Sequence, residues 1–371
     1  MINNKVKGEI KKINSVRGTV YRPEKDWSYS HHPSITFFKG MFYAVWSNGK
    51  ENEDDLGQRI LISRSPDGET WETPKPLITP EMLGDEEKVI TASGFHVYDD
   101  TLYVYYSVYN YTDEALGGKK TRPRGDDGAH RDTDCGYLET KDGVNFSEPK
   151  PLGFGMVINH GPQKTKSGKL IIAGHTVYPV TDDPRGISGY KMRGIFGDAI
   201  KFDEDYPVDN SDIADVAKIN GWATRLLCEG SFYETDDGVW QMLLRCPDFR
   251  LWHTESRDLG ETWSDPEPTD FIDDGSKTHA GRLPDGRYYV VSNPVPWSHR
   301  IPLNIHLSTD GENFDKHYIL RDEPYEQRIE GFGKAGVYGY PHTLVHGDYM
   351  YVIYSKHKED VEVTKFKLSE L

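Results

Sequence analysis

Short apolar runs alternate with tight polar turns along the whole chain. The runs at residues 42–46, 102–106 and 350–354 are rich in Tyr and Val, which is typical of buried β-strands. Six hairpins share the form of apolar strand, polar turn and apolar strand, with turns at Lys39-Gly40, Asp99-Asp100, Ser167-Gly168, Asp237-Gly238, Asp285-Gly286 and Gly347-Asp348. Helical periodicity is nearly absent, since only residues 81–88 and 211–218 could form short helical turns. The pattern therefore predicts an all-β protein.

The six hairpin turns recur at intervals of 48 to 70 residues, which indicates one repeated unit. A β-propeller requires such repetition, because each sheet buries its faces only against its neighbours. We expect a single domain over residues 1–371 with six blades, and seven blades remain an alternative. The stretch that ends at Tyr21 is expected to pair with residues 361–368 in the last blade and to close the ring.

Two long segments, residues 110–134 and 181–220, interrupt the repeat. The first contains five basic residues among acidic ones, and the second is rich in Asp, Gly and Pro. Long loops on a rigid scaffold often carry binding specificity. Both segments are expected to be rim loops over one face of the propeller, with a solvated surface excursion as the alternative.

A second repeat supports the first. A Ser or Thr, an Asp, a Gly and an aromatic residue recur four times in the same order, in segments that start at Ser65, Thr140, Ser256 and Ser308. The Asp can accept hydrogen bonds from its own turn, the Gly can adopt a positive φ, and the aromatic ring can fill the space between sheets. This pattern resembles the Asp-box of sialidase-like β-propellers, although only the segment at Ser256 has the full Asp-x-Gly spacing. The resemblance implies an all-β, sialidase-type propeller.

The formal net charge of −16 argues against a nucleic-acid partner, because the phosphate backbone would be repelled. A small anionic ligand remains compatible, since a few local Arg and His residues can outweigh a distant global charge. Cys135, Cys228 and Cys246 form an odd set, so the sequence predicts neither a disulfide framework nor a zinc site. We expect no cofactor, although the Asp-rich turns could hold a structural calcium ion.

The N-terminal residues lack the apolar core of a signal peptide, and no apolar run is long enough to span a bilayer. We therefore expect a cytoplasmic protein with no membrane partner, or a secreted one if a leader has been removed.

Four short segments resemble the catalytic segments of sialidases and occur in the same order. Glu229 and Arg245 flank one hairpin turn almost symmetrically, so they are expected to face each other, either in a substrate site or as a structural ion pair. Arg300 starts a run that is similar to the third-arginine segment of sialidases. Tyr340 lies in a segment that resembles the one with their nucleophilic tyrosine. Asp55, in the pair Asp54-Asp55, lies where that family has its acid/base aspartate.

The first strand departs from the sialidase pattern, because residues 30–35 contain no arginine. His31 or His32 occupies the corresponding place. Adjacent strand residues point to opposite faces, so only one of the two histidines is expected to enter the site, and the pair would chelate a metal poorly. The missing arginine weakens the case for sialic acid, whose carboxylate is bound by the arginine triad in the family.

Several histidines lie near the predicted starts of blades or close to Tyr340. His160 and His279 open the third and fifth predicted blades, His175 lies opposite His160 across a hairpin, and His342 follows Tyr340 by two positions. Such a set resembles propeller lyases and rhamnosidases that act on rhamnose–glucuronate polysaccharides. In those lyases a His or Tyr removes the proton beside a uronate carboxylate. Each histidine taken singly is more typical of a hydrogen-bonded core residue.

The leading hypothesis is a sialidase-like glycoside hydrolase that acts on an acidic or deoxy sugar of an oligosaccharide. Tyr340 and Glu229 would form the nucleophile pair, and Asp55 would be the acid/base. The substrate-binding residues would be Arg245, Arg300, His31, His32, His342 and His279. The alternatives are a lyase that uses His160, His175 or Tyr340, and a carbohydrate-binding propeller without catalysis.

Overall fold

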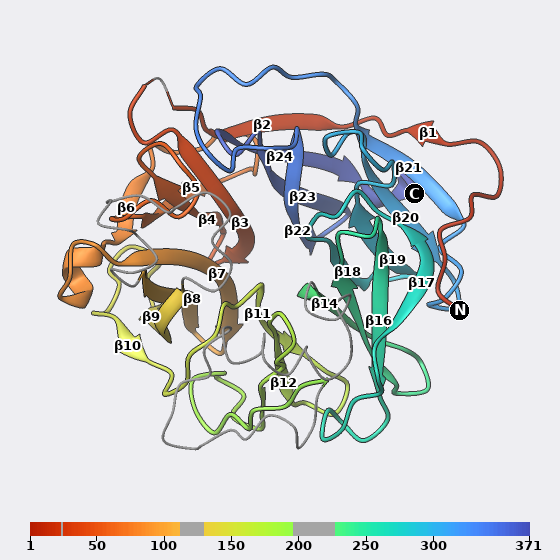
Figure 1. Ribbon diagram of the computed structural model, residues 1–371, viewed down its shortest axis with the longest axis horizontal. Helices are drawn as coiled ribbons and strands as arrows, with labels where there is room; N and C mark the ends of the chain where they lie inside the picture. Colours follow the sequence, from red (N-terminus) through yellow and green to blue (C-terminus); the bar gives the residue numbers. More distant parts are fainter. Residues whose placement is uncertain (24, 112–129, 196–226) are drawn as a thin grey trace.

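The computed structural model describes residues 1–23, 25–111, 130–195 and 227–371. Six sheets surround a central axis, and the first strand of each sheet lies nearest to that axis (Figure 1). The predicted all-β, six-bladed propeller is therefore confirmed. Most of the two expected rim insertions, 110–134 and 181–220, and the possible helical turn at 211–218 lie outside the described residues.

The blades follow one another in chain order. Blade 1 contains β3 (Tyr29–Phe38), β4 (Met41–Gly49), β5 (Arg59–Ser65) and β6 (Lys75–Ile78). Blade 2 contains β7 (Val89–Tyr98), β8 (Thr101–Tyr111), β9 (His130–Thr140) and β10 (Lys150–Pro151). Blade 3 contains β11 (His160–Lys164), β12 (Leu170–Ala173) and β13 (Val180–Thr181). Blade 4 contains β14 (Cys228–Glu234), β15 (Trp240–Arg245), β16 (Arg250–Ser256) and β17 (Glu267–Ile272). Blade 5 contains β18 (His279–Arg282), β19 (Tyr288–Ser292), β20 (Leu303–Ser308) and β21 (Lys316–Arg321). Blade 6 contains β22 (Tyr338–His346), β23 (Tyr349–Lys356) and β24 (Asp360–Lys367).

The six expected hairpin turns each join the first two strands of a blade. The helical turn expected near residue 81 is a 3-10 helix, η1 (Pro80–Leu83), and a second one, η4 (Leu368–Glu370), follows β24. Across the described ranges, no helix is long and apolar enough to cross a membrane.

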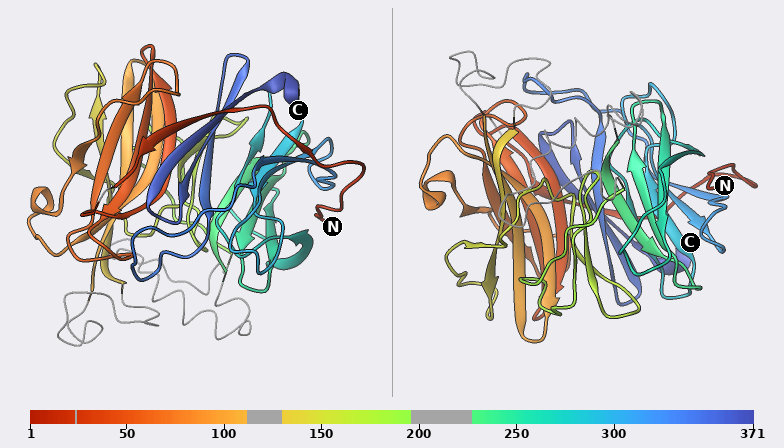
Figure 2. Two further views of the ribbon diagram at one scale, coloured as in Figure 1. Left: turned by 90° about the horizontal axis from the view of Figure 1, so that it is seen from above. Right: turned by 60° about the horizontal axis from the view of Figure 1, so that its bottom comes forward.

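The N-terminal segment runs along the outside of the last two blades (Figure 2). β1 (Lys11–Lys12) pairs in parallel with β21 of blade 5, and β2 (Val16–Tyr21) pairs antiparallel with β24 of blade 6. The fourth strand of blade 6 therefore comes from the opposite end of the chain to the other three.

The four repeated Asp-Gly turns link local conformation to packing between blades. In the first turn, Asp67 Oδ1 accepts the N–H groups of Glu69 and Thr70, both at 2.8 Å. The glycines of the four turns all have φ between 72° and 86°, a region that L-residues rarely adopt. The aromatic residue of each turn packs into an interblade cluster; these residues are Trp71, Phe146, Trp263 and Phe314. The turns thus fix rings between neighbouring sheets.

Hydrogen bonds near the axis tie each blade to the one before it. At five of the six junctions, a backbone N–H at the inner strand donates to a side chain of the preceding blade. The donors and acceptors are Ala92 to Ser47 (2.9 Å), Ile158 to Ser107 (3.0 Å), Ala280 to Ser231 (2.7 Å), Thr343 to His279 (3.2 Å) and Ile35 to His342 (3.3 Å). At the remaining junction, the Gly230 N–H donates to the Gly174 carbonyl (2.9 Å). The last of the side-chain bonds joins blade 1 to blade 6 and closes the ring.

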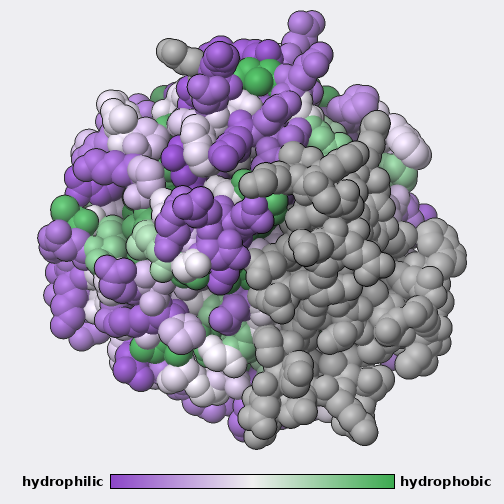
Figure 3. Space-filling view, turned by 60° about the vertical axis from the view of Figure 1, so that its left-hand side comes forward, coloured by the Kyte–Doolittle hydropathy of each residue, from purple (hydrophilic) through white to green (hydrophobic). Residues whose placement is uncertain are grey.

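The outer surface contrasts with these interblade clusters. In Figure 3 the coloured part of the face is mostly hydrophilic, and its apolar residues are scattered singly or in small groups. Apolar burial is thus directed between the blades and toward the axis, where the inner strands converge.

Acid should weaken the folded state through the two histidines of the ring. Burial lowers the pKa of His342 to about 3 and holds that of His279 well below its usual value, whereas both titrate near 6.5 in an unfolded chain. Between pH 3 and pH 6.5 the unfolded chain therefore binds more protons than the folded one. The stability that is fully present above pH 6.5 is therefore lost as the pH falls toward 3, by about 1.4 kcal/mol per pH unit for each such group.

Urea unfolding between pH 7.5 and pH 4.5 measures this effect. The pH slope of the unfolding free energy should be shallower in His342→Gln than in the wild type, by about 1.4 kcal/mol per pH unit. His346→Gln, which removes another histidine from β22, is the matched control. Equal slopes in the wild type and His342→Gln would contradict the prediction.

Candidate active site

Five of the six inner strands have a register shift, and in three of them a non-glycine residue near the start of the strand has a positive φ. The strand register shifts between His31 and Ser34 in β3, between Cys228 and Ser231 in β14, and between Gly339 and His342 in β22. The bulged residues His32, Glu229 and Tyr340 have φ of 52°, 54° and 56°. A bulge redirects a side chain that regular alternation would send elsewhere, and strained backbone of this kind is concentrated at functional sites. The bulges turn these residues toward a common point.

A buried tyrosine–glutamate contact lies at this point. The Tyr340 hydroxyl donates a hydrogen bond to Glu229 Oε1, and the two residues are only 5% and 6% exposed. Arg245 Nη1 donates both to Glu229 Oε2 (2.8 Å) and to the Tyr340 hydroxyl oxygen (3.1 Å). The expected pairing of Glu229 with Arg245 across the hairpin is therefore present, and Tyr340 joins it from blade 6.

The electrostatics set the protonation of this pair. Burial raises the pKa of Tyr340 well above its ordinary value, and the neighbouring Glu229 charge adds to the shift. Burial alone would also raise the pKa of Glu229, but the Arg245 charge and the Tyr340 hydrogen bond bring it down to about 2. At neutral pH the site thus holds a neutral phenol beside an ionised carboxylate, which is the arrangement of a latent nucleophile and its base.

Three further cations approach the Tyr340 ring. Arg300 Cζ, Lys277 Nζ and Lys358 Nζ lie 5.6, 5.5 and 6.0 Å from the ring centroid. Lys358 forms an ion pair with Glu53 (2.6 Å). Sequence reasoning missed both lysines, because neither belongs to a repeated segment. Their positions two residues before β18 and two residues after β23 were the available signal. With Arg245, four cations thus surround Tyr340, and two of them are paired with the carboxylates of Glu229 and Glu53.

Both histidines of β3 contact the tyrosine, so the expectation that only one of them enters the site is wrong. The ring centroids of His31 and His32 lie 3.7 and 5.1 Å from that of Tyr340. The bulge at His32 breaks the two-residue alternation on which the expectation depended. Burial and the nearby Lys358 hold the pKa of His31 well below its usual value. The neutral His31 ring thus cannot supply the charge of the missing arginine.

The structure separates the roles of Asp54 and Asp55. Asp55 accepts hydrogen bonds from the backbone N–H groups of Glu51 (3.1 Å) and Asn52 (2.8 Å), and also from the Asn52 side chain. Its carboxylate thus holds the loop after β4. Asp54 instead accepts the Tyr109 hydroxyl at 2.7 Å, and its charge acts on the pKa of His32. The geometry favours Asp54 over the predicted Asp55 as the carboxyl group of the site.

The loop that contains Arg300 has strained backbone and is held in place by hydrogen bonds. Trp297, His299 and Arg300 all have positive φ, between 57° and 61°. Asp274 accepts the backbone N–H groups of Trp297 (2.7 Å) and Arg300 (2.6 Å). The indole of Trp297 is 79% exposed, and its ring centroid lies 4.2 Å from that of Phe249. The loop therefore presents a guanidinium and an aromatic surface at neighbouring positions.

The remaining predicted histidines lie deeper, along the axis. The ligand atoms of His160, His279 and His342 lie within 4.8 Å of one another, a spacing from which three imidazoles could hold a metal ion. However, backbone N–H groups donate to Nδ1 of His279 and of His342. In the neutral rings the proton then sits on Nε2, where a metal would need the lone pair. These contacts favour the interblade role of His279 and His342 over both metal binding and the predicted substrate contact.

His160 and His175 differ from each other in environment. His160 Nε2 donates to the Thr278 carbonyl (3.0 Å), so the lone pair of the neutral ring is on the buried Nδ1. His175 is half-buried, and its charge contributes to the low pKa of Glu229. Only His175 of these two therefore acts on the Tyr340–Glu229 pair.

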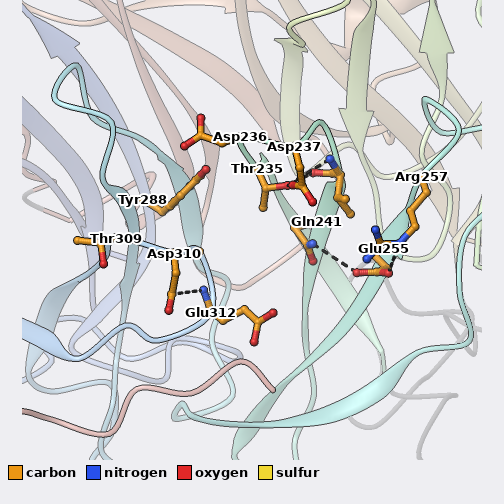
Figure 4. Close-up of a pocket in the computed structure, with 12 residues that line it drawn as sticks. Thr235, Asp236, Asp237, Gln241, Glu255, Arg257, Tyr288, Thr309, Asp310 and Glu312 are labelled. Atoms are coloured by element: carbon orange, nitrogen blue, oxygen red, sulfur yellow. Dashed lines mark hydrogen bonds and ion pairs between the residues drawn. The ribbon is translucent and has the colours of Figure 1, made fainter.

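A cavity of about 350 Å³ opens at the opposite end of the strands (Figure 4). Its lining includes the acidic residues Asp236, Asp237 and Glu312. Because β14 runs from Cys228 to Glu234, the turn at Asp237 lies at the far end of the strand from Glu229. This cavity is separate from the candidate site.

The chain matches the BNR repeat-like domain family over residues 40–352. No curated protein matches it. Among solved structures, a sialidase is 17% identical with a TM-score of 0.65, and the match covers 99% of this chain and 35% of the sialidase. A protein of unknown function from Dyadobacter fermentans DSM 18053 is 17% identical with a TM-score of 0.65, covering 96% of this chain and 100% of that protein. The intramolecular trans-sialidase from Ruminococcus gnavus is 13% identical with a TM-score of 0.64, covering 95% and 98% of the two chains.

These identities are low, so the structural likeness establishes the fold and leaves the catalytic residues open. This chain spans about a third of the length of the first sialidase. The family match extends over most of the chain and includes all six hairpin turns except the start of the first. The chain therefore belongs to the BNR repeat-like domain family, and its fold is the six-bladed β-propeller of sialidases.

Proposed function

We propose that the protein is a glycoside hydrolase that cleaves an acidic sugar from an oligosaccharide through a tyrosine nucleophile. The buried contact of the Tyr340 hydroxyl with Glu229, bridged by Arg245, is the observation that carries this proposal. A carboxylate nucleophile would be repelled by an anionic group close to the anomeric carbon. A neutral phenol that loses its proton only during attack avoids this repulsion, which is why tyrosine suits an acidic sugar.

The residues support a two-step reaction. Glu229 accepts the phenol proton while Tyr340 Oη forms a bond to the anomeric carbon and the bond to the leaving oxygen breaks. Asp54, which takes up a proton from solvent before this step, donates it to that oxygen, so that a neutral alcohol departs. Water, deprotonated by Asp54, then attacks the glycosyl–tyrosine intermediate, and Glu229 returns the proton to Tyr340. Arg245 and Arg300 would bind the anionic group of the sugar, for which the planar guanidinium is well suited.

Mass spectrometry of products in H₂¹⁸O tests the reaction class. With a panel of sialosides and rhamnose–glucuronate oligosaccharides, at least one substrate should give a free acidic sugar that has gained one labelled water. An unsaturated uronate would instead establish β-elimination. Binding without any product would establish a carbohydrate-binding propeller. Either of these results would overturn the proposal.

Tyr340→Phe should reduce kcat by at least about 100-fold, because it removes the nucleophilic oxygen and leaves the ring. Tyr338→Phe is the matched control, since it removes another buried tyrosine hydroxyl from β22, one that bonds to the Glu323 carbonyl (2.8 Å). Steady-state kinetics on the substrate found in the panel measures both variants. Comparable activity in Tyr340→Phe and Tyr338→Phe would remove tyrosine from the mechanism.

Asp54→Asn should slow the cleavage of natural glycosides by about 100-fold, while substrates with an acidic phenol as leaving group should be affected much less, because such a phenol departs without protonation. Asp55→Asn should mainly lower the melting temperature, since it disturbs the loop contacts of Glu51 and Asn52. The comparison needs kcat/KM for both substrate types and a melting curve for each variant. The opposite pattern would restore Asp55 as the acid/base.

Trp297→Ala should raise KM for an oligosaccharide by about 10-fold and leave KM for a small aryl glycoside unchanged. The exposed indole offers a flat apolar surface on which a leaving-group sugar can stack. Phe249→Ala removes the ring that packs against the Trp297 indole, and so tests whether that contact holds the indole in place. An equal effect on both substrates would show that the indole acts on the Arg300 loop instead.

A further inference from the structure

Lys277 is a buried cation without a carboxylate partner. The residue is 4% exposed, and its Nζ donates to the Asn159 carbonyl of blade 3. Within the described ranges, no carboxylate lies within ion-pair distance, 4.0 Å, of Nζ. By contrast, the cations Arg245 and Lys358, which also surround Tyr340, are paired with Glu229 and Glu53.

Arg300 is half-buried and likewise has no ion-pair partner within the described ranges. One of its terminal nitrogens, Nη1, is buried without a hydrogen-bond partner in the described part of the chain. Its Cζ and Lys277 Nζ lie at similar distances from the Tyr340 ring centroid, 5.6 and 5.5 Å. Two unpaired positive groups thus converge on the proposed nucleophile.

Burying a charge without a partner is unfavourable, so such groups are typical of sites where a ligand supplies the partner. The first strand has no arginine, and His31 in its place is held neutral by burial. The site therefore lacks a positive charge on blade 1 and has an additional one on blade 5. An anionic group bound between Arg300 and Lys277 would pair both cations at once.

We propose that Lys277 is the third cation of the anion-binding site and contacts the carboxylate of the acidic sugar together with Arg300. This rests on the proposed function for the identity of the sugar. The lysine acts as a point charge, whereas Arg300 offers a planar fork. Unlike a site made of arginines, this one can lose part of its charge by deprotonation.

The titration of Lys277 should make substrate affinity depend on pH. Burial lowers the pKa of Lys277 to about 8, and the Glu229 charge opposes the shift. The surrounding imidazoles have pKa values below their usual one and Tyr340 one far above, so none of them changes charge near pH 8; these residues are His31, His32, His160, His279, His342 and Tyr340. Burial raises the pKa of Asp273, whose charge acts on Arg245 and Arg300, to about 7, so this carboxyl group ionises before Lys277 loses its proton, and it does so in K277M as well. Substrate affinity should therefore decline as the pH rises through 8.

Steady-state kinetics between pH 6.5 and pH 9.5 tests the proposal. The wild-type KM should rise by about tenfold per pH unit above 8. K277M should have a KM at least about 30-fold higher at pH 7, with no alkaline rise. K277R should keep a low KM that no longer rises, because the guanidinium stays charged. K334M, which removes another buried lysine, one that bonds to Ser28 Oγ (2.8 Å), is the matched control.

Calorimetric titration with N-acetylneuraminate and D-glucuronate separates this inference from the proposed function. If the wild type binds either sugar acid and K277M binds it at least about 30-fold more weakly, the lysine assignment holds even when no substrate is hydrolysed. If hydrolysis occurs but K277M retains the wild-type KM and its alkaline rise, the lysine assignment fails and the hydrolase proposal survives. If the wild type binds neither sugar acid and hydrolyses no substrate, both fail.

Discussion

Each sheet of the propeller has two apolar faces, and only the neighbouring sheets can cover them. This constraint forces the inner strands to converge on one axis, where the backbone of each blade needs a hydrogen-bond acceptor from the blade before it. Serine meets that need at three junctions, and histidine at two, His279 and His342. The candidate site lies on the same axis. Glu229, Tyr340 and His31 are more than a hundred residues apart in the chain, and ring closure brings them into contact.

The site departs from the regular geometry of the strands that support it. Positive φ at His32, Glu229 and Tyr340 costs about 1–3 kcal/mol for each residue. Three sheets packed on both faces can hold such strained positions, and a free hairpin could not. The result is a phenol, a carboxylate and a guanidinium held in mutual contact before any ligand arrives. Rigidity of this kind reduces the reorganisation that catalysis requires.

Much of this arrangement was accessible from the sequence, and the exceptions have identifiable causes. Hairpin symmetry placed Glu229 opposite Arg245, and the resemblance to sialidases indicated Tyr340 and Arg300. The bulge in β3 has no sequence signature, so strict alternation wrongly assigned one of His31 and His32 to the opposite face. Asp54 and Asp55 are adjacent, and only the loop hydrogen bonds distinguish them. The contacts of Lys277 are with Asn159 of blade 3 and Tyr340 of blade 6, which lie far from it in sequence, so its role could not be predicted from its own segment.

The pairing of β2 with β24 has a consequence for synthesis of the chain. β2 ends at Tyr21 and its partner begins at Asp360. At translation rates of about 5–20 residues per second, β2 therefore exists for roughly 20–70 s before its neighbour is synthesised. During that time a strand edge is open to pairing with other nascent chains. Of the four exposed or half-exposed residues of β2, Arg17 and Thr19 are polar, and the Arg17 charge disfavours pairing of this edge with another chain while the ribosome completes the ring.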